Sequence, residues 1–109
     1  MAEVIKVLGQ VDAPATSLTA LYTVPASTET VASTLMIANR TASNRRIRVS
    51  VAVAGAADSD EQYILYDVLV SKQDFISATI GLTLAATDVV RVYADGADVS
   101  FSLFGTEVS

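Results

Sequence analysis

The sequence predicts an all-β protein of about eight antiparallel strands in a two-sheet sandwich, with a jelly roll as the favoured architecture. Valine and threonine, whose branched side chains pack well on a pleated surface, are abundant in the 109 residues. Apolar and polar residues alternate with a period of two in several segments, and small polar residues separate these segments at short, even intervals. An immunoglobulin-like sandwich is the second architecture that fits. A parallel sheet is disfavoured, because no segment resembles a capped helix long enough for a crossover.

Eight segments carry the strand pattern, and residues 1–109 are expected to form a single domain. The segments are residues 4–9, 17–24, 30–39, 45–54, 62–70, 75–84, 88–94 and 98–108. The second and third are the least distinct. Between Thr28 and Arg40, the residues Val31, Leu35 and Ala38 would also line one face of a helix, but the many threonines and serines favour a strand.

Alternation is clearest in Arg46–Val53, where the four aliphatic residues at alternate positions are expected to face the core. In the seventh segment, Val90 and Val92 are expected to face inward and Arg91 outward. The dipeptide Asp95-Gly96 that follows is typical of a hairpin turn, because both residues tolerate a positive φ.

Asp67 is the most unusual polar residue of the predicted strands, because it interrupts an apolar run. Strict alternation would place Tyr63, Leu65, Asp67 and Leu69 on one side of that strand. We favour a structural role for Asp67, in a hydrogen bond at a sheet face or a subunit contact, over a role as a catalytic acid.

The composition excludes several classes of chemistry. The chain has no cysteine and no histidine, so a Ser-His-Asp or Cys-His enzyme, a zinc site and a disulfide scaffold are all ruled out. A pair of carboxylates remains the least implausible catalytic device. The acidic segments 58–61 and 95–98 offer oxygen atoms for Ca²⁺, but neither has a complete calcium-loop pattern. We therefore expect no enzymatic activity and no cofactor.

The formal charge of −5 argues against sequence-independent nucleic-acid binding, because the overall field repels phosphates. No apolar run approaches the roughly 18 residues of a membrane span, and no secretory signal is recognised, so we expect neither membrane association nor export. Four arginines, Arg40, Arg45, Arg46 and Arg48, lie close together in the sequence. They are candidates for contact with an acidic protein surface, but the favoured explanation is that they line the solvent face of a strand and the turn before it, because no aromatic residues interleave with them.

The first segment is a candidate for contact with another chain. If Val4 to Leu8 is an edge strand, its free backbone can pair with a neighbour, and Val4 and Lys6 are then candidate contact residues. Tyr63 and Tyr66 beside Asp67 are the best local combination for recognising a sugar. The Asn39-Arg40-Thr41 sequon is interpreted as accidental.

Five stretches of the sequence share one resemblance, and they are Leu8-Gly9-Gln10, Ala15–Ala26, Ile37–Arg40, Thr83–Tyr93 and Phe101–Gly105. Together they resemble small β-sandwich structural proteins of tailed bacteriophages. The resemblance spans almost the whole chain, but these phrases mark strands and turns and carry over no functional residue.

The resemblance implies a non-enzymatic virion component, assembled in many copies in the host cytoplasm. The leading hypothesis is a capsid cement or decoration protein that forms a homo-oligomer, with a trimer as the expected state, and clamps neighbouring capsid subunits. The alternative is a tail fibre or baseplate module that binds a host-surface glycan. An enzyme acting on polysaccharide is the least favoured of the three.

Overall fold

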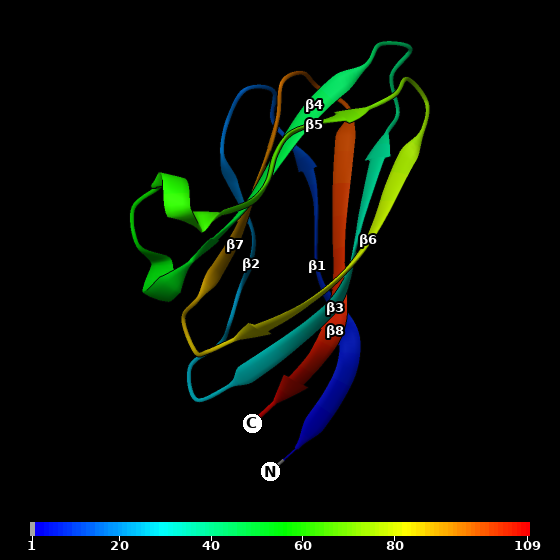
Figure 1. Ribbon diagram of the computed structural model, residues 1–109. Coiled ribbons are helices and arrows are strands. Elements are labelled where there is room, and N and C mark those ends of the chain that lie inside the picture. Colours follow the sequence, from blue (N-terminus) through cyan, green and yellow to red (C-terminus); the bar gives the residue numbers. More distant parts are fainter. Residues whose placement is uncertain (1) are drawn as a thin grey trace.

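The computed structural model describes residues 2–109 and is a sandwich of two four-stranded antiparallel sheets (Figure 1). The strands are β1 (Glu3–Ala13), β2 (Thr19–Thr23), β3 (Glu29–Asn39), β4 (Arg45–Ala52), β5 (Tyr63–Val70), β6 (Phe75–Leu84), β7 (Val89–Ala94) and β8 (Val99–Val108). Two short 3₁₀ turns, η1 (Val53–Gly55) and η2 (Asp60–Gln62), lie between β4 and β5. The predicted all-β sandwich of eight strands is confirmed. The described residues contain no helix that is long and apolar enough to cross a membrane.

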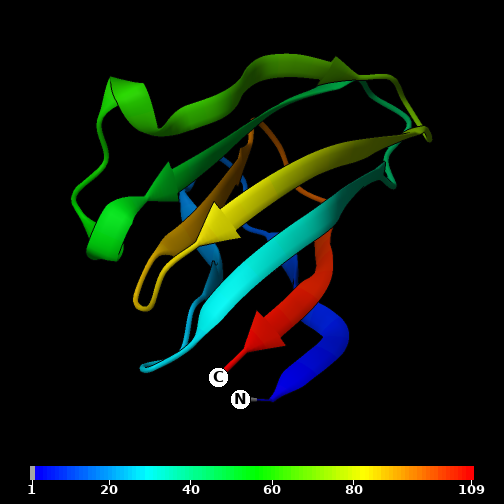
Figure 2. The ribbon, with the colours of Figure 1, turned by 60° about the horizontal axis from the view of Figure 1, so that its bottom comes forward.

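The strand order is that of a jelly roll. Sheet A has the order β1-β8-β3-β6, and sheet B has the order β2-β7-β4-β5 (Figure 2). The first strand pairs with the last, the second with the seventh, the third with the sixth and the fourth with the fifth. This is the pairing of one long antiparallel ribbon rolled onto itself, and it separates the fold from the immunoglobulin-like alternative.

The strand favoured over a helix for Thr28–Arg40 is confirmed, because β3 is hydrogen-bonded to β6 on one side and to β8 on the other. The hairpin expected at Asp95-Gly96 is wrong, because this turn leads from β7 in sheet B to β8 in sheet A. The residue of the turn with a positive φ is Asp98, at 67°.

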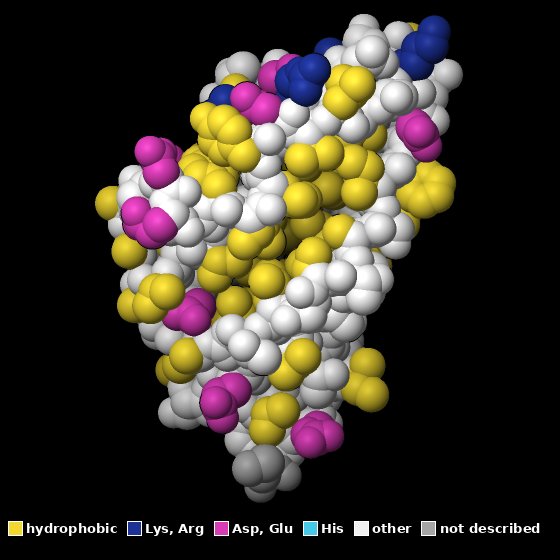
Figure 3. All heavy atoms as spheres, in the orientation of Figure 1, with side chains coloured by type: hydrophobic (Ala, Val, Ile, Leu, Met, Phe, Trp, Pro, Cys, Tyr) yellow, Lys and Arg dark blue, Asp and Glu magenta, His cyan; other side chains and the backbone are white. Residues whose placement is uncertain are grey.

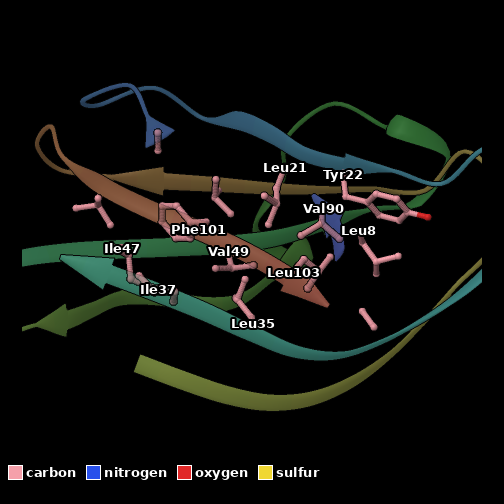
Figure 4. Close-up of a cluster of buried hydrophobic side chains, with 14 of the residues drawn as sticks. Leu8, Leu21, Tyr22, Leu35, Ile37, Ile47, Val49, Val90, Phe101 and Leu103 are labelled. Atoms are coloured by element: carbon pink, nitrogen blue, oxygen red, sulfur yellow. The ribbon is translucent and has the colours of Figure 1, made fainter. Parts of the chain in front are cut away.

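The core lies between the two sheets. Figure 4 shows apolar side chains of both sheets meeting in one layer, and Phe101, Leu35 and Ile37 of sheet A are fully buried there. The alternation of β4 is confirmed for Ile47 and Val49, which have no exposed surface. It fails at the end of the predicted segment. The strand stops at Ala52, and Val53 is 70% exposed in η1.

The face expected for Asp67 and its neighbours is also wrong, because β5 contains more residues than β4 opposite it. Two irregularities interrupt the register between β4 and β5, and Asp67 has a φ of 54° within the strand. An extra residue reverses which side chains face the core. Leu65 and Val68 consequently face inward, whereas Leu69 is 45% exposed.

Asn39 ties together two turns at one end of the sandwich. Its side chain is 3% exposed, and its Nδ2 donates hydrogen bonds to the carbonyl oxygens of Ser43 at 2.8 Å and Val70 at 3.1 Å. Its Oδ1 accepts the backbone N–H of Thr41 at 3.0 Å. The side-chain amide of Asn39, the first residue of the sequon, is therefore buried and hydrogen-bonded within the fold.

Tyr22 links the two sheets near the opposite end. Its hydroxyl donates to Glu107 of β8 and lies 2.8 Å from the Thr30 hydroxyl of β3, and Glu107 also pairs with Lys6 of β1 at 3.3 Å. Burial, together with the hydrogen bond to Glu107, raises the pKa of Tyr22 from 10.0 to about 12. The hydrogen bond from Tyr22 lowers the pKa of Glu107.

The raised pKa of Tyr22 predicts a loss of stability in alkali. The folded state keeps the proton up to a pH of about 12, whereas the unfolded chain releases it near 10, so the stabilisation is complete below pH 10 and is lost as pH rises through 12. The expected loss in the free energy of unfolding is about 2–3 kcal/mol. Urea unfolding at a series of pH values measures it. Tyr22→Phe should be less stable at neutral pH and should lack this alkaline loss; an identical alkaline profile in the variant would contradict the assignment.

A second prediction concerns Gly105 of β8. A Cβ atom there would overlap the carbonyl oxygen of Val31 and approach Ala32 on the neighbouring strand β3. We expect Gly105→Ala to destabilise the fold by about 1–3 kcal/mol, because backbone cannot move aside cheaply. Thr106→Ala, on the outer face of the same strand, is the control and should change stability by less than about 0.5 kcal/mol. Equal melting temperatures for the two variants would show that the backbone of β3 does not need to lie as close to residue 105 as it does in this structure.

Candidate interaction surfaces

The four arginines of the predicted contact patch do not form one free basic surface. Arg40, in the turn between β3 and β4, pairs with Asp12 at 2.6 Å and lies 3.9 Å from Asp98. Arg45 reaches the carbonyl oxygen of Ala97 at 3.5 Å. Arg40 is thus neutralised within the chain, at the end where β1, β3 and β8 meet their turns.

Arg48 is held in place more firmly than the others. Its Nε donates to Asp67 Oδ1 at 2.7 Å, and this hydrogen bond raises the pKa of the guanidinium. Its Cζ lies 4.3 Å from the ring centre of Tyr66 and 4.6 Å from that of Tyr93, so the guanidinium lies against both rings. Arg46 donates to the backbone carbonyl oxygen of Asp67 at 2.9 Å. Among the ion pairs formed within residues 2–109, Arg45 and Arg46 have no carboxylate partner.

The formal charge is concentrated in one half of the molecule. The half that contains the β1–β2, β3–β4, β5–β6 and β7–β8 connections has equal numbers of basic and acidic side chains. They are Arg40, Arg45, Arg46, Arg48, Lys72, Asp12, Asp67, Asp74, Asp95 and Asp98. The other half has seven acidic side chains and two basic ones, Lys6 and Arg91, so the whole charge of −5 lies there. The acidic segments 58–61 and 95–98 are consequently at opposite ends.

The N-terminal strand is an edge strand, with its second long side unpaired. Val4 is 50% exposed, and the neighbouring Ile5 and Val7 are 87% and 46% exposed. Lys6 is paired with Glu107 of the neighbouring strand β8. The exposed surface of this strand therefore combines these three apolar side chains with polar or charged ones, and the cation proposed for contact is already paired.

The opposite side of the sandwich is open. There the edge strands β5 and β6 belong to different sheets, and their inward apolar side chains, apart from the buried Val70 and Leu84, are only half-buried. These side chains are Leu65, Val68, Ile76, Ala78, Ile80 and Leu82. Figure 3 shows apolar side chains gathered in a hollow on this side of the molecule. We call these six side chains the open apolar edge.

The outer face of sheet B carries an aromatic corner, which consists of Tyr63, Tyr66 and Asp60. The rings of Tyr63 and Tyr66 have centres 5.1 Å apart and planes at 89°, and they line a hollow of about 430 Å³ together with Asp60. Burial and a hydrogen bond to Asp58 raise the pKa of Tyr63. The structure thus brings together the two tyrosines that the sequence indicated, but Asp67 binds Arg48 and Asp60 takes its place in the hollow.

Within residues 2–109, no three His, Cys, Asp or Glu side chains come together in a way that could hold a metal ion. Neither acidic segment that was considered as a calcium loop forms such a group. Asp88 has a structural role that was not predicted from the sequence, and so has Asn39, which was considered only as part of the sequon. Asp88 accepts the backbone N–H groups of Ala54 and Ala85, each at 2.9 Å. The position of Asn39 and Asp88 directly beside a predicted turn is the sequence feature that could have indicated these roles, because short acidic and amide side chains hydrogen-bond to the backbone of turns.

These features define an all-β jelly roll whose distinctive surfaces are an open apolar edge, an N-terminal edge strand with exposed Val4, Ile5 and Val7, and an aromatic corner. No protein-family model matches the chain, and no curated protein does. A chain in the acidic stable capsid structure of Helicobacter pylori bacteriophage KHP30 has a similar fold, with a TM-score of 0.53 and 17% sequence identity. The match covers 99% of this chain and 98% of that chain. At this identity the likeness is one of fold.

The bulge at Asp67 yields a prediction that separates its backbone role from its charge. Asparagine tolerates a positive φ, so Asp67→Asn should lower the free energy of unfolding by no more than about 1 kcal/mol, the usual limit for an exposed ion pair. Valine does not tolerate a positive φ, and Asp67→Val should lower the free energy of unfolding by about 1–3 kcal/mol more. Denaturant midpoints of the two variants measure the difference. Equal midpoints would show that β5 does not require this backbone conformation.

Proposed function

We propose that this protein is a non-enzymatic structural component of a phage virion, a capsid cement or decoration protein that oligomerises and clamps capsid subunits. One observation carries the proposal, namely the open apolar edge. Side chains that point into the core of a sandwich are normally covered, and burial of exposed apolar surface drives protein association. A partner protein that covered β5 and β6 would complete the core.

The full-length fold likeness supports a phage shell as the place where that partner is found. The related fold belongs to a chain in a phage capsid structure, and the match leaves almost no part of either chain unaligned. The sequence resemblance to small virion proteins rests on short stretches of sequence and not on the fold, and it also supports a structural component of a phage virion.

A second copy of this chain is the partner that fits the open apolar edge. The exposed apolar residues Val4, Ile5 and Val7 lie on β1, at the opposite edge of sheet A from β6. One copy can therefore place its β1 edge against the β5–β6 side of the next. A contact between two different surfaces is heterologous, and it forms a ring when the rotation closes. A trimer is the ring that we expect.

The capsid would be contacted by the end that contains the arginines. Arg45, Arg46 and Lys72 are the cations of that end that remain for an acidic capsid surface, because Arg40 and Arg48 are paired with Asp12 and Asp67. This end has no net charge, so it approaches another protein without the repulsion that the acidic half would meet at an acidic surface.

A tail fibre or baseplate module remains the second candidate function, because the aromatic corner is a surface that such a module could use. Copy number distinguishes the two. Cryo-electron microscopy of the intact particle should show hundreds of copies, bound between capsid subunits. A few dozen copies at the tail would overturn the cement assignment and favour the second candidate.

The oligomer is tested with the purified chain and one pair of variants. Light scattering after gel filtration should give the mass of a trimer, and Ile80→Lys at the open apolar edge should shift it to a monomer that no longer binds capsids. Ser77→Lys, on the outer face of the same strand, is the control and should behave as wild type. A monomeric wild-type protein, even at high concentration, would refute this mode of assembly whether or not the variant folds.

A further inference from the structure

We infer that the aromatic corner of Tyr63, Tyr66 and Asp60 is a binding site for a neutral saccharide. It is separate from the open apolar edge and does not depend on the place of the protein in the virion. The two tyrosine rings meet at a right angle around a hollow of about 430 Å³, and Asp60 supplies a carboxylate at its rim. Sites for small ligands typically have volumes of roughly 300–1,000 Å³.

Tyr66 is fixed in position before any ligand arrives. Its side chain is 56% exposed, yet the guanidinium of Arg48 lies over its ring, 4.3 Å from the centre. Arg48 is in turn held by the ring of Tyr93 and by the carboxylate of Asp67, at the bulge of β5. An exposed tyrosine held in this way loses little conformational freedom on binding, which is the advantage of a preorganised site.

The chemistry of the corner matches a sugar ring. The C–H face of a pyranose is apolar and can pack against the exposed aromatic surface of Tyr66, beside the ring of Tyr63. The hydroxyl groups of the sugar can donate hydrogen bonds to the carboxylate of Asp60, which only accepts them. A small number of polar groups beside aromatic walls is the usual composition of a small-molecule site.

The surrounding charges favour a neutral sugar over an anionic one. Asp58, Asp60 and Glu61 lie on the short segment beside the hollow, in the acidic half of the molecule. The nearest arginine, Arg48, is already paired with Asp67 and is therefore not free to bind a sugar carboxylate. The guanidinium of Arg48 already lies against the ring of Tyr66, so a second cation on that ring would be repelled by its charge, which disfavours a quaternary ammonium group.

The test uses the whole purified chain, first on an array of neutral and sialylated oligosaccharides and then by NMR titration with lactose, maltose, sialyllactose and choline. We expect saturable binding of a neutral sugar, with the largest signal changes at Tyr63 and Tyr66. Sialyllactose should bind more weakly than lactose. Preferential binding of sialyllactose or choline would contradict the assignment, as would the absence of binding by every neutral saccharide on the array.

Variants locate the site. Tyr66→Ala should weaken binding by about tenfold, the order expected for the loss of one aromatic contact. Phe75→Ala is the matched control, because Phe75 is a similarly exposed ring (60%) on sheet A. Arg48→Met tests the positioning role, because it retains both tyrosines but removes the guanidinium that fixes the ring of Tyr66, and it should weaken binding. Melting temperatures confirm that each variant is folded. If Tyr66→Ala and Phe75→Ala bind equally well, the saccharide is bound elsewhere and the proposal is wrong.

Discussion

The pairing of the first strand with the last is the constraint on which the rest of the fold depends. The ladder from Glu3↔Val108 to Ala13↔Val99 joins the two ends of the chain, and β8 then also pairs with β3. Of the sheet pairs, only β4–β5 joins strands that are consecutive in the sequence. The loop-closure entropy of the other pairs must be offset by burial of a shared core. That core contains Phe101 and Leu103 of β8, which lie near its centre in Figure 4.

Alternation in the sequence was sufficient to predict the strands, because most of them have one buried face. The sixth predicted segment, 75–84, has the same limits as β6, and the fourth begins at the same residue as β4. The jelly roll could be favoured only by strand number, since pairing depends on contacts between distant segments that no local pattern contains. The helix alternative at Thr28–Arg40 failed because a strand with neighbours on both sides is stabilised by two ladders.

Surface properties could be predicted less well, because they depend on which strands become neighbours. The closely spaced arginines suggested one basic patch, but the turns bring Asp12 and Asp98 to Arg40, and the bulge of β5 brings Asp67 to Arg48. Similarly, nothing in the sequence of β5 or β6 indicates that both are edge strands. A closed core would require the same apolar residues in these strands, and only the strand order shows that this side of the sandwich is open.

The bulge in β5 determines how the two proposed surfaces are related. In a regular strand, side chains alternate between faces, and one inserted residue reverses that order. At Asp67 the insertion lets Leu65 and Val68 both face the open apolar edge while Tyr66 faces outward. The proposed subunit contact and the aromatic corner therefore lie on the two faces of one edge strand. A neighbouring subunit that covers the open edge would leave the outer face of sheet B free, so assembly and saccharide binding can occur together. Substitutions on one face of β5 should then change one property without the other.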